Sequence, residues 1–442
     1  MILVLLLVAI NPKINIQMKL WKKSFSIDKR IEEFTIGNDR EIDLHIAKYD
    51  IQASIAHAKM LHKIEILSNE ELQKLITGLE ELLDQITLGD FVIEDCFEDI
   101  HSKIENELTK RYGDVGKKIH TARSRNDQVL VALQLYYKNE LTQIHDLTDT
   151  FFNTLIRLAK TYENKLLPGY THLQVAMPSS FGLWFSAYAE SLIDDITLLK
   201  ALQKIVDQNP LGSAAGYGSS FAIDREFTTK ELNFSNLKYN VVAAQMSRGK
   251  NERILTSIIG NLANTLGKFS MDICLYMSQN FNFITFPDIF TTGSSIMPHK
   301  KNPDLFELIR GKCNKIQATY TEMLLLCNNL PSGYHRDYQL LKDNSIRVIE
   351  DIKDILSIFN YALDKIIINE IDFSDEKYKY LFTVDAINDL VQTGVPFREA
   401  YQNISTEIET CNYAAVVSSK HTHIGSMHNL CLNEITEKYY SP

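Results

Sequence analysis

Long stretches of the sequence repeat apolar residues every three or four positions. One stretch without glycine or proline carries an apolar stripe at Leu133, Tyr137, Leu141, Ile144, Leu147, Phe151, Leu155 and Leu158. This spacing places the side chains on one face of an α-helix that is longer than the globular average. Similar stripes predict long helices over residues 179–208, 250–281, 304–329 and 342–370.

These stripes predict an all-α fold, since no series of alternating strands interrupts them. Long amphipathic helices bury their stripes against each other, so we expect an elongated central bundle, and surplus apolar surface would favour oligomers. We expect an N-terminal extension (1–17), an N-terminal helical domain (18–120), a central bundle that forms the oligomer core (121–370) and a C-terminal helical domain (371–442).

Composition narrows the class of protein. A chain of 442 residues, 45% of them hydrophobic, can bury a large core. Its net charge of -10 argues against a general affinity for nucleic acid or anionic membranes. The six cysteines lie far apart without a C-x-x-C pair, which is typical of reduced thiols. We therefore expect a cytoplasmic protein without disulfides or structural zinc.

The first residues, "MILVLLLVAINPKINIQMKLW", have an apolar run that is too short to span a membrane but suits the core of a signal peptide. No positive charge precedes this run, and no small-x-small cleavage site follows it. We therefore favour an N-terminal extension, with Met18 as the start of the functional chain, over a secretion signal.

The segment "IHTARSRNDQV" (119–129) stands where the first long helix is predicted to begin. Arg123 and Arg125 carry planar guanidinium groups that suit carboxylates, and Thr121, Ser124 and Asn126 add neutral donors near a helix N-terminus. These residues predict an anion-binding site. The alternative is an ordinary helix start held by surface salt bridges.

The segment "LPGYTHLQVAMPSS" (167–180) is predicted to be a loop between two long helices. His172 has Thr171 and Gln174 as polar neighbours, so its imidazole is a candidate acid or base near neutral pH. The alternative is a surface or hydrogen-bonded core histidine. A histidine-rich segment, "KHTHIGSMH" (420–428), has no helical pair of histidines and no carboxylate nearby in sequence, so we expect no metal there.

The segment "TGSSIMPHKKNPD" (292–304) combines a flexible arm with a predicted helix start. Gly293 permits unusual backbone angles, Asn302 is a predicted N-cap, and Pro303 suits the first helical position. Lys300 would then bind a carboxylate in front of the helix N-terminus. Ser294, with its proton affinity lowered by nearby cations, is a candidate base. The alternative is an ordinary mobile surface loop.

Taken together, the motifs resemble those of a known enzyme family. "GSSIMPHKKNP" resembles the signature of the aspartase/fumarase superfamily of cofactor-independent lyases, and "HTARSRNDQV" and "GYTHLQVAMP" resemble the argininosuccinate lyase family within it. The resemblance covers the chain from about Met18 to its end. It implies an all-helical homotetramer, with sites shared between three subunits, that releases fumarate and arginine from argininosuccinate reversibly and without a cofactor.

The resemblance also implies roles for individual residues. Ser294 matches the base that removes a proton beside a carboxylate, His172 matches the residue linked to protonation of the leaving nitrogen, and Glu307 matches its carboxylate partner. The candidate substrate-binding residues, which include donors adjacent to the matched positions, are Asp43, Arg123, Ser124, Arg125, Asn126, Thr171, Gln174, Lys300, Asn302, Tyr334, Gln339 and Lys342.

Two departures and two alternatives remain open at this point. The chain has Asp39 and Arg40 just before Asp43, where the family often has a small hydroxyl residue, and residues 241–253 differ from its usual acidic pattern. One alternative is another member of the superfamily, such as adenylosuccinate lyase, aspartase or fumarase, and residues 334–342 argue against it. The other is a delta-crystallin-like structural protein, which the intact catalytic positions disfavour.

Overall fold

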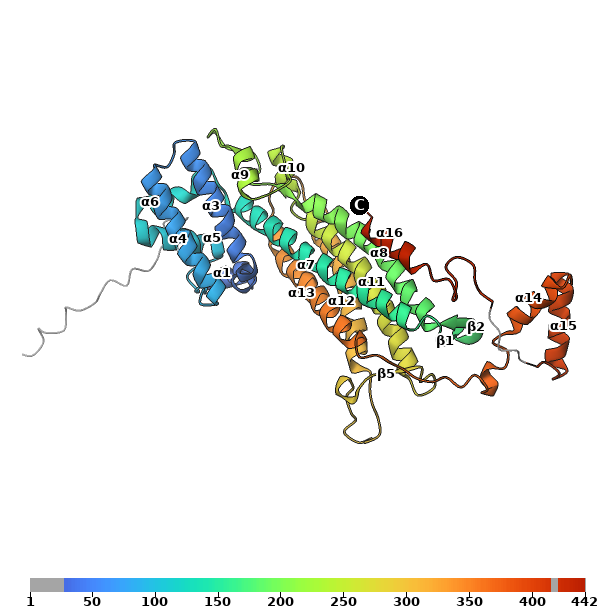
Figure 1. Cartoon of the computed structure of the whole chain (residues 1–442). Coiled ribbons are helices and arrows are strands. Elements are labelled where there is room, and N and C mark those ends of the chain that lie inside the picture. The colour runs from blue at the N-terminus through green and yellow to red at the C-terminus, as the bar shows by residue number, and fades with distance from the viewer. Residues whose placement is uncertain (1–27, 415–419, 442) are drawn as a thin grey trace, which may run out of the picture. The chain divides into compact units, whose positions relative to one another are not determined.

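The computed structural model of the chain describes residues 28–414 and 420–441, and helices form most of it (Figure 1). The predicted all-α fold is confirmed. The predicted extension at residues 1–17 lies outside the described residues.

The α-helices are α1 (Lys29–Ile36), α2 (Asp39–Ile42), α3 (Ala47–Lys63), α4 (Asn69–Leu88), α5 (Ile100–Tyr112), α6 (Asp114–Lys117), α7 (Arg125–Thr161), α8 (Phe181–Val206), α9 (Arg225–Glu231), α10 (Val241–Met246), α11 (Lys250–Met277), α12 (Asp304–Leu326), α13 (Leu341–Leu363), α14 (Thr383–Gln392), α15 (Phe397–Glu409) and α16 (Leu432–Tyr440). The strands are β1 (Leu166–Thr171), β2 (Gln174–Ser180), β3 (Gln208–Asn209), β4 (Asn236–Leu237), β5 (Ile284–Thr285) and β6 (Ile367–Ile368).

The long helices α7, α8, α11, α12 and α13 correspond to the predicted apolar stripes, and their starts agree with the prediction to within a few residues. Helix α13 ends at Leu363, earlier than predicted, because the following segment forms strand β6. In β6, Ile367 and Ile368 pair antiparallel with β5. The apolar pattern continues past the end of α13. The conformation changes there because isoleucine is β-branched and favours strands.

The chain divides into two compact units that interleave in sequence. The first unit contains the described residues up to Lys138, together with Val206–Lys250 and Cys327–Ile346. The second contains Asn139–Ile205, Asn251–Leu326 and the described residues from Arg347 onward. Helices α7 and α13 contribute to both units, and the domain boundaries expected near residues 120 and 370 stay a prediction.

The first unit has an apolar core formed mainly by α3, α4 and α5. Helix α4 begins with a capping box, in which Ser68 Oγ accepts a hydrogen bond from the Glu71 backbone N–H and Glu71 accepts one from the Ser68 backbone N–H. Helices α4 and α5 approach closely at Gly78, where a Cβ atom would lie 2.8 Å from side-chain atoms of Leu108 and Tyr112. This core supports the segments that carry the candidate site described below.

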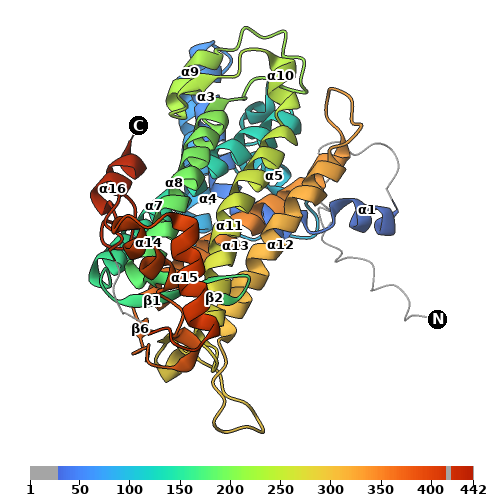
Figure 2. The same ribbon diagram turned by 90° about the vertical axis from the view of Figure 1, so that its right-hand side faces the viewer.

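In the second unit, α8, α11 and α12 run alongside one another, as Figures 1 and 2 both show. Aromatic side chains fill the space between the long helices. The Phe359 ring of α13 lies 5.2 Å from the rings of Phe151 on α7 and Phe269 on α11, and 5.7 Å from Phe306 on α12. These four buried rings join four helices into one bundle.

The predicted loop at 167–180 is instead a β-hairpin, which corrects the sequence-based prediction. Strands β1 and β2 pair antiparallel, with Thr171 opposite Gln174. His172 and Leu173 form the two-residue turn, with φ angles of +53° and +59°. Positive φ at both turn positions matches the right-handed twist of the paired strands. The prolines that suggested a loop, Pro168 and Pro178, are accommodated where the pairing becomes irregular.

Candidate active site

A cavity of about 150 Å³ lies in the first unit. Its lining includes six of the predicted substrate-binding residues, namely Asp43, Arg125, Asn126, Tyr334, Gln339 and Lys342. Asp39, Glu98, Asp99, His101, Arg248 and Arg336 add charged groups to the lining. The fold therefore assembles one polar cavity from segments that are as much as 300 residues apart in the sequence.

Lys342 lies between two carboxylates. Its Nζ is 2.6 Å from Asp43 Oδ1 and 2.9 Å from Asp39 Oδ1. Burial alone would lower the pKa of Lys342, but the charges of Asp43 and Asp39 raise the pKa above its usual value. The ammonium group is therefore charged at neutral pH. It sits at the start of α13, where it pairs with both acidic groups.

Arg125 is the first residue of α7, and its guanidinium group faces acidic neighbours. Nη1 lies 2.8 Å from Glu98 Oε2 and 3.4 Å from Asp99 Oδ2. Burial opposes the charge of Arg125, but Asp99 and Glu98 raise its pKa. Asn126 follows on the first helical turn, so both side chains reach the cavity from a rigid helix start.

Ser124 caps the start of α7. Its Oγ accepts a hydrogen bond from the Asn126 backbone N–H at 3.2 Å, and its own N–H donates to Asp127 Oδ1 at 2.9 Å. Ser124 is not part of the cavity lining. In this structure Ser124 caps α7, whereas the sequence analysis expected it to contact the substrate.

Arg123 also differs from the expectation that it joins Arg125 in one anion site. It is buried, Nη1 donates to Ser54 Oγ at 2.9 Å, and Nη2 lies 3.8 Å from Asp50 Oδ1. The preceding residue, Ala122, has a φ of +60°. This left-handed backbone turns Arg123 toward α3 and away from the cavity.

Sequence analysis missed a polar stripe on α3 made of Asp50, Ser54 and His57. Their spacing of four and three residues places them on one helix face, and all three are buried. His57 Nε2 lies 2.9 Å from the Thr121 carbonyl oxygen. Burial, and the nearby charge of Arg123, lower the pKa of His57 well below its usual value, so it is neutral. The sequence signal that could have revealed this stripe is the helical spacing of its polar residues within an apolar segment.

The same stripe reaches His101 at the cavity wall. His101 Nδ1 lies 3.1 Å from Asp50 Oδ2, and both side chains are almost fully buried. Burial alone would lower the pKa of His101, but Asp50, Asp99 and Asp43 raise it above the usual value. The imidazolium form is therefore stabilised by folding.

This pKa shift predicts a pH dependence of stability. Because the folded-state pKa of His101 is raised, its contribution is fully present below the unfolded pKa of about 6.5 and is lost as the pH rises through the folded value. As the pH rises above about 6.5, we expect the free energy of unfolding to fall less for His101→Gln than for wild type, because the variant lacks the titrating imidazole. Urea unfolding across pH 6 to 9 measures the free energy of unfolding of each protein. His45→Gln, which replaces an exposed histidine, is the control. Identical pH profiles for wild type and His101→Gln would contradict the assignment.

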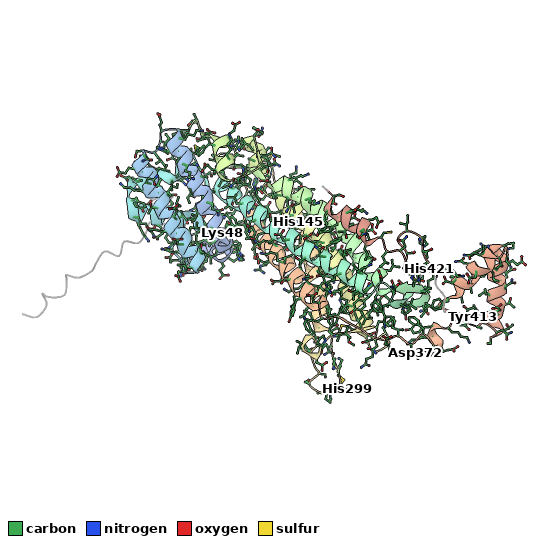
Figure 3. The ribbon with its side chains drawn as sticks, in the orientation of Figure 1. Lys48, His145, His299, Asp372, Tyr413 and His421 are labelled. Atoms are coloured by element: carbon green, nitrogen blue, oxygen red, sulfur yellow. The ribbon has the colours of Figure 1, made fainter. Side chains whose placement is uncertain are left out.

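The candidate base Ser294 lies in the second unit, on a loop closed by a bridge between Thr292 and Asn302. The Asn302 N–H donates to the Thr292 carbonyl oxygen at 2.9 Å, and Ser294 Oγ accepts from the Met297 N–H at 3.1 Å. Figure 3 places His299 near the end of this loop, away from the helices. Lys300 is exposed on the same loop.

Two details of this segment differ from the prediction. Helix α12 begins at Asp304, and the Pro303 carbonyl oxygen accepts the first helical hydrogen bond, so Pro303 rather than Asn302 holds the N-cap position. Asn302 closes the loop instead. Gly293 does not have the positive φ angle that only glycine adopts readily.

The other two candidate catalytic residues are solvent-exposed in the second unit. His172, with Thr171 and Gln174 beside it, is exposed at the tip of the hairpin, and Glu307 is exposed on the first turn of α12. Within the described residues, no hydrogen bond or ion pair joins His172 to Glu307 or to Ser294. One chain therefore holds these three groups on separate surface elements.

Two carboxylates that are distant in sequence lie beside the histidine-rich segment 420–428. His421 Nε2 lies 2.9 Å from Asp385 Oδ1, and Lys420 Nζ lies 2.8 Å from Asp389 Oδ1. Both acids belong to α14. Among residues 28–414 and 420–441, no three His, Cys, Asp or Glu side chains are grouped so that they could hold a metal ion.

Solved structures of superfamily lyases share this fold. EDDS lyase in complex with formate superposes with a TM-score of 0.71 at 20% sequence identity, covering 94% of this chain and 84% of the lyase. A class II fumarase of Schistosoma mansoni has a TM-score of 0.71 at 18% identity, covering 87% of this chain and 91% of the fumarase.

Sequence relatives define the family more narrowly. A family profile described as lyase matches residues 22–318. An argininosuccinate lyase of Bacteroides fragilis is 50% identical over 418 residues, which is 95% of this chain and 94% of that protein. An argininosuccinate lyase of Thermotoga neapolitana is 42% identical over 387 residues, which is 88% of this chain and 97% of that protein. The chain belongs to the argininosuccinate lyase family.

Proposed function

We propose that this chain forms an enzyme that reversibly cleaves argininosuccinate into arginine and fumarate. The observation that carries the proposal is the cavity of the first unit, in which Arg125, Asn126, Tyr334, Gln339 and Lys342 converge. Its lining combines cations that suit carboxylates with anions that suit an ammonium or guanidinium group. The substrate carries both kinds of group. The relatives at 42% to 50% identity support the same activity.

The proposed chemistry is an elimination by general acid and base. Ser294 removes a proton from the carbon next to a carboxylate of the succinate moiety. As the bond between the neighbouring carbon and the guanidino nitrogen breaks, the carbon–carbon double bond of fumarate forms. The departing nitrogen receives a proton from His172, which Glu307 orients. Lys300 and Asn302 stabilise the carboxylate beside which negative charge develops.

We propose that the complete site contains residues from three subunits of a homotetramer. The cavity of about 150 Å³ is small for a ligand pocket and is lined only by the first unit. The exposed elements that carry Ser294, His172 and Glu307 also expose apolar side chains, with Ile296 83% exposed, Leu173 70% and Leu308 68%. Exposed apolar groups beside reactive ones suit an interface that completes a site.

The remaining expectations concern location and partners. No helix in the described part of the chain is long and apolar enough to cross a membrane. All six cysteines are free thiols, which suits the reducing cytoplasm that we propose for this protein. The only partner we propose, apart from other copies of the chain, is the small-molecule substrate.

One assay tests the proposed function. Purified protein should form fumarate, detected by its absorbance, from argininosuccinate, and should do so far faster than from adenylosuccinate, aspartate or malate. The assay should contain EDTA, because the proposed chemistry uses only protein side chains. Preference for one of the other substrates would assign the chain to a different activity, and failure to form fumarate from any of them would favour a structural role.

A further inference from the structure

The hairpin of β1 and β2 lies between the end of α7 and the start of α8 and carries His172 at its tip (Figure 1). Its two strands form a sheet of their own, and their pairing is irregular between Pro168 and Tyr170. A two-stranded hairpin is only marginally stable by itself. Contacts outside the hairpin must therefore set the position of its tip.

Tyr170, two residues before His172, packs its ring against the segment that follows α11. The centroid of the Tyr170 ring lies 5.1 Å from that of Phe281 and 6.3 Å from that of Phe283. The Phe281 and Phe283 rings are 5.3 Å apart, and Phe283 is buried. Aromatic pairs prefer edge-to-face or offset geometries, so these contacts orient the Tyr170 ring as well as cover it.

The Tyr170 hydroxyl reaches a second segment. It donates a hydrogen bond to the hydroxyl of Tyr378, which is buried at the end of the 3₁₀ helix η5 (Glu376–Tyr378). Burial and this hydrogen bond raise the pKa of Tyr170, so the hydroxyl stays protonated. Tyr378 is itself held in place, because its N–H donates to the Asp375 carbonyl oxygen at 2.8 Å and its ring lies 5.6 Å from that of Phe373.

The two segments that contact Tyr170 are also joined to each other. Strands β5 and β6 pair antiparallel. Next to this pair, the Asn369 N–H donates to the Phe283 carbonyl oxygen at 2.9 Å, and the Asn369 side-chain amide donates to the Asn282 carbonyl oxygen at 3.0 Å. Tyr170 therefore attaches the hairpin to a single hydrogen-bonded unit made of residues 281–285 and 367–378.

From this arrangement we propose that Tyr170 is a positioning residue, whose ring and hydroxyl fix the hairpin so that His172 meets the leaving nitrogen of the substrate in a productive orientation. The inference rests on the proposed function. Tyr170 acts through His172 and needs no contact with the substrate. A displacement of about 1 Å in a catalytic group can cost about 10²-fold in rate, so a contact at the base of the hairpin affects turnover.

Kinetics of single and double variants test this role. Tyr170→Phe removes only the hydroxyl and should lower kcat for argininosuccinate about 5-fold, the loss expected for one neutral hydrogen bond. Tyr378→Phe breaks the same bond, so it should have the same effect, and the double variant should be no slower than either single variant. In the His172→Asn background, Tyr170→Phe should lower kcat no further. Tyr401→Phe removes an exposed hydroxyl on α15 and should keep the wild-type kcat.

Amide hydrogen exchange tests the inference without turnover. Exchange in residues 171–175 should be about 5-fold faster in Tyr170→Phe than in wild type, because the lost contact opposes local opening of the hairpin, and exchange in the middle of α8 should not change. Tyr378→Phe replaces Tyr170→Phe in this experiment if the latter folds poorly.

The two measurements separate this inference from the proposed function. If wild type forms no fumarate, the proposed function fails, and faster exchange in Tyr170→Phe still supports the placement of the hairpin by Tyr170. Unchanged exchange in residues 171–175 would overturn the inference. An equal loss of kcat in the wild-type and His172→Asn backgrounds would also overturn it, because Tyr170 would then act on the fold as a whole and not through His172.

Discussion

Ser294→Ala and His172→Asn should each lower kcat by about 10²-fold or more, the usual scale for losing a positioned acid or base. Both residues lie on surface elements, where Ser294 makes only local contacts with its own loop and His172 is exposed. Their replacement should therefore leave folding intact. Steady-state kinetics with argininosuccinate, together with a thermal unfolding midpoint for each variant, measure the two effects separately.

Ser295→Ala is the matched control for Ser294→Ala, because it removes the neighbouring hydroxyl from the same exposed loop. It should reduce kcat far less. A larger loss at Ser295 than at Ser294 would transfer the role of base to Ser295. Near-normal turnover by His172→Asn would remove that histidine from the mechanism.

Mixing the two inactive variants should restore activity, because the proposed site takes Ser294 and His172 from different chains. Equal amounts of Ser294→Ala and His172→Asn protein are unfolded and refolded together, so that chains distribute at random among tetramers. A site is intact when its His172 comes from the serine variant and its Ser294 from the histidine variant. About one quarter of sites should meet both conditions, so activity should approach that fraction of refolded wild type.

A shared site would also bring together Arg125 and His172, which α7 separates within one chain. Arg125 is the first residue of α7, whereas His172 follows the last residue, Thr161. A helix of 37 residues is about 55 Å long. Each variant refolded alone is the control for the mixture. If refolded wild type regains activity while the mixture stays as inactive as its parents, His172 and Ser294 act from the same chain.

The sequence by itself determined the helical class and the positions of the long helices. Apolar residues repeated every three or four positions can be buried together only on a helix, so the stripe from Leu133 to Leu158 predicted α7 directly. It also drew attention to the candidate site segments, since the donors of residues 119–129 and the hydroxyls and lysines of residues 292–304 are uncommon in such density. These signals are local, and local patterns are what a sequence displays.

The tertiary structure decided which of these residues face a common cavity. Arg123 and Arg125 are two positions apart, yet the left-handed backbone at Ala122 directs Arg123 to Ser54 and leaves Arg125 in the cavity. Packing also decided that residues 167–180 pair as strands, because that conformation depends on a partner segment as much as on local preference.

The surroundings of Asp39 and Asp43 likewise depended on partners that are distant in sequence. Both are acidic, and they lie one helical turn apart, so the sequence does not distinguish them. Lys342, about 300 residues away, contacts both, and the Ile100 N–H engages only Asp43. Burial and pairing set how much of each carboxylate is exposed. Those two quantities arise only when distant segments pack together.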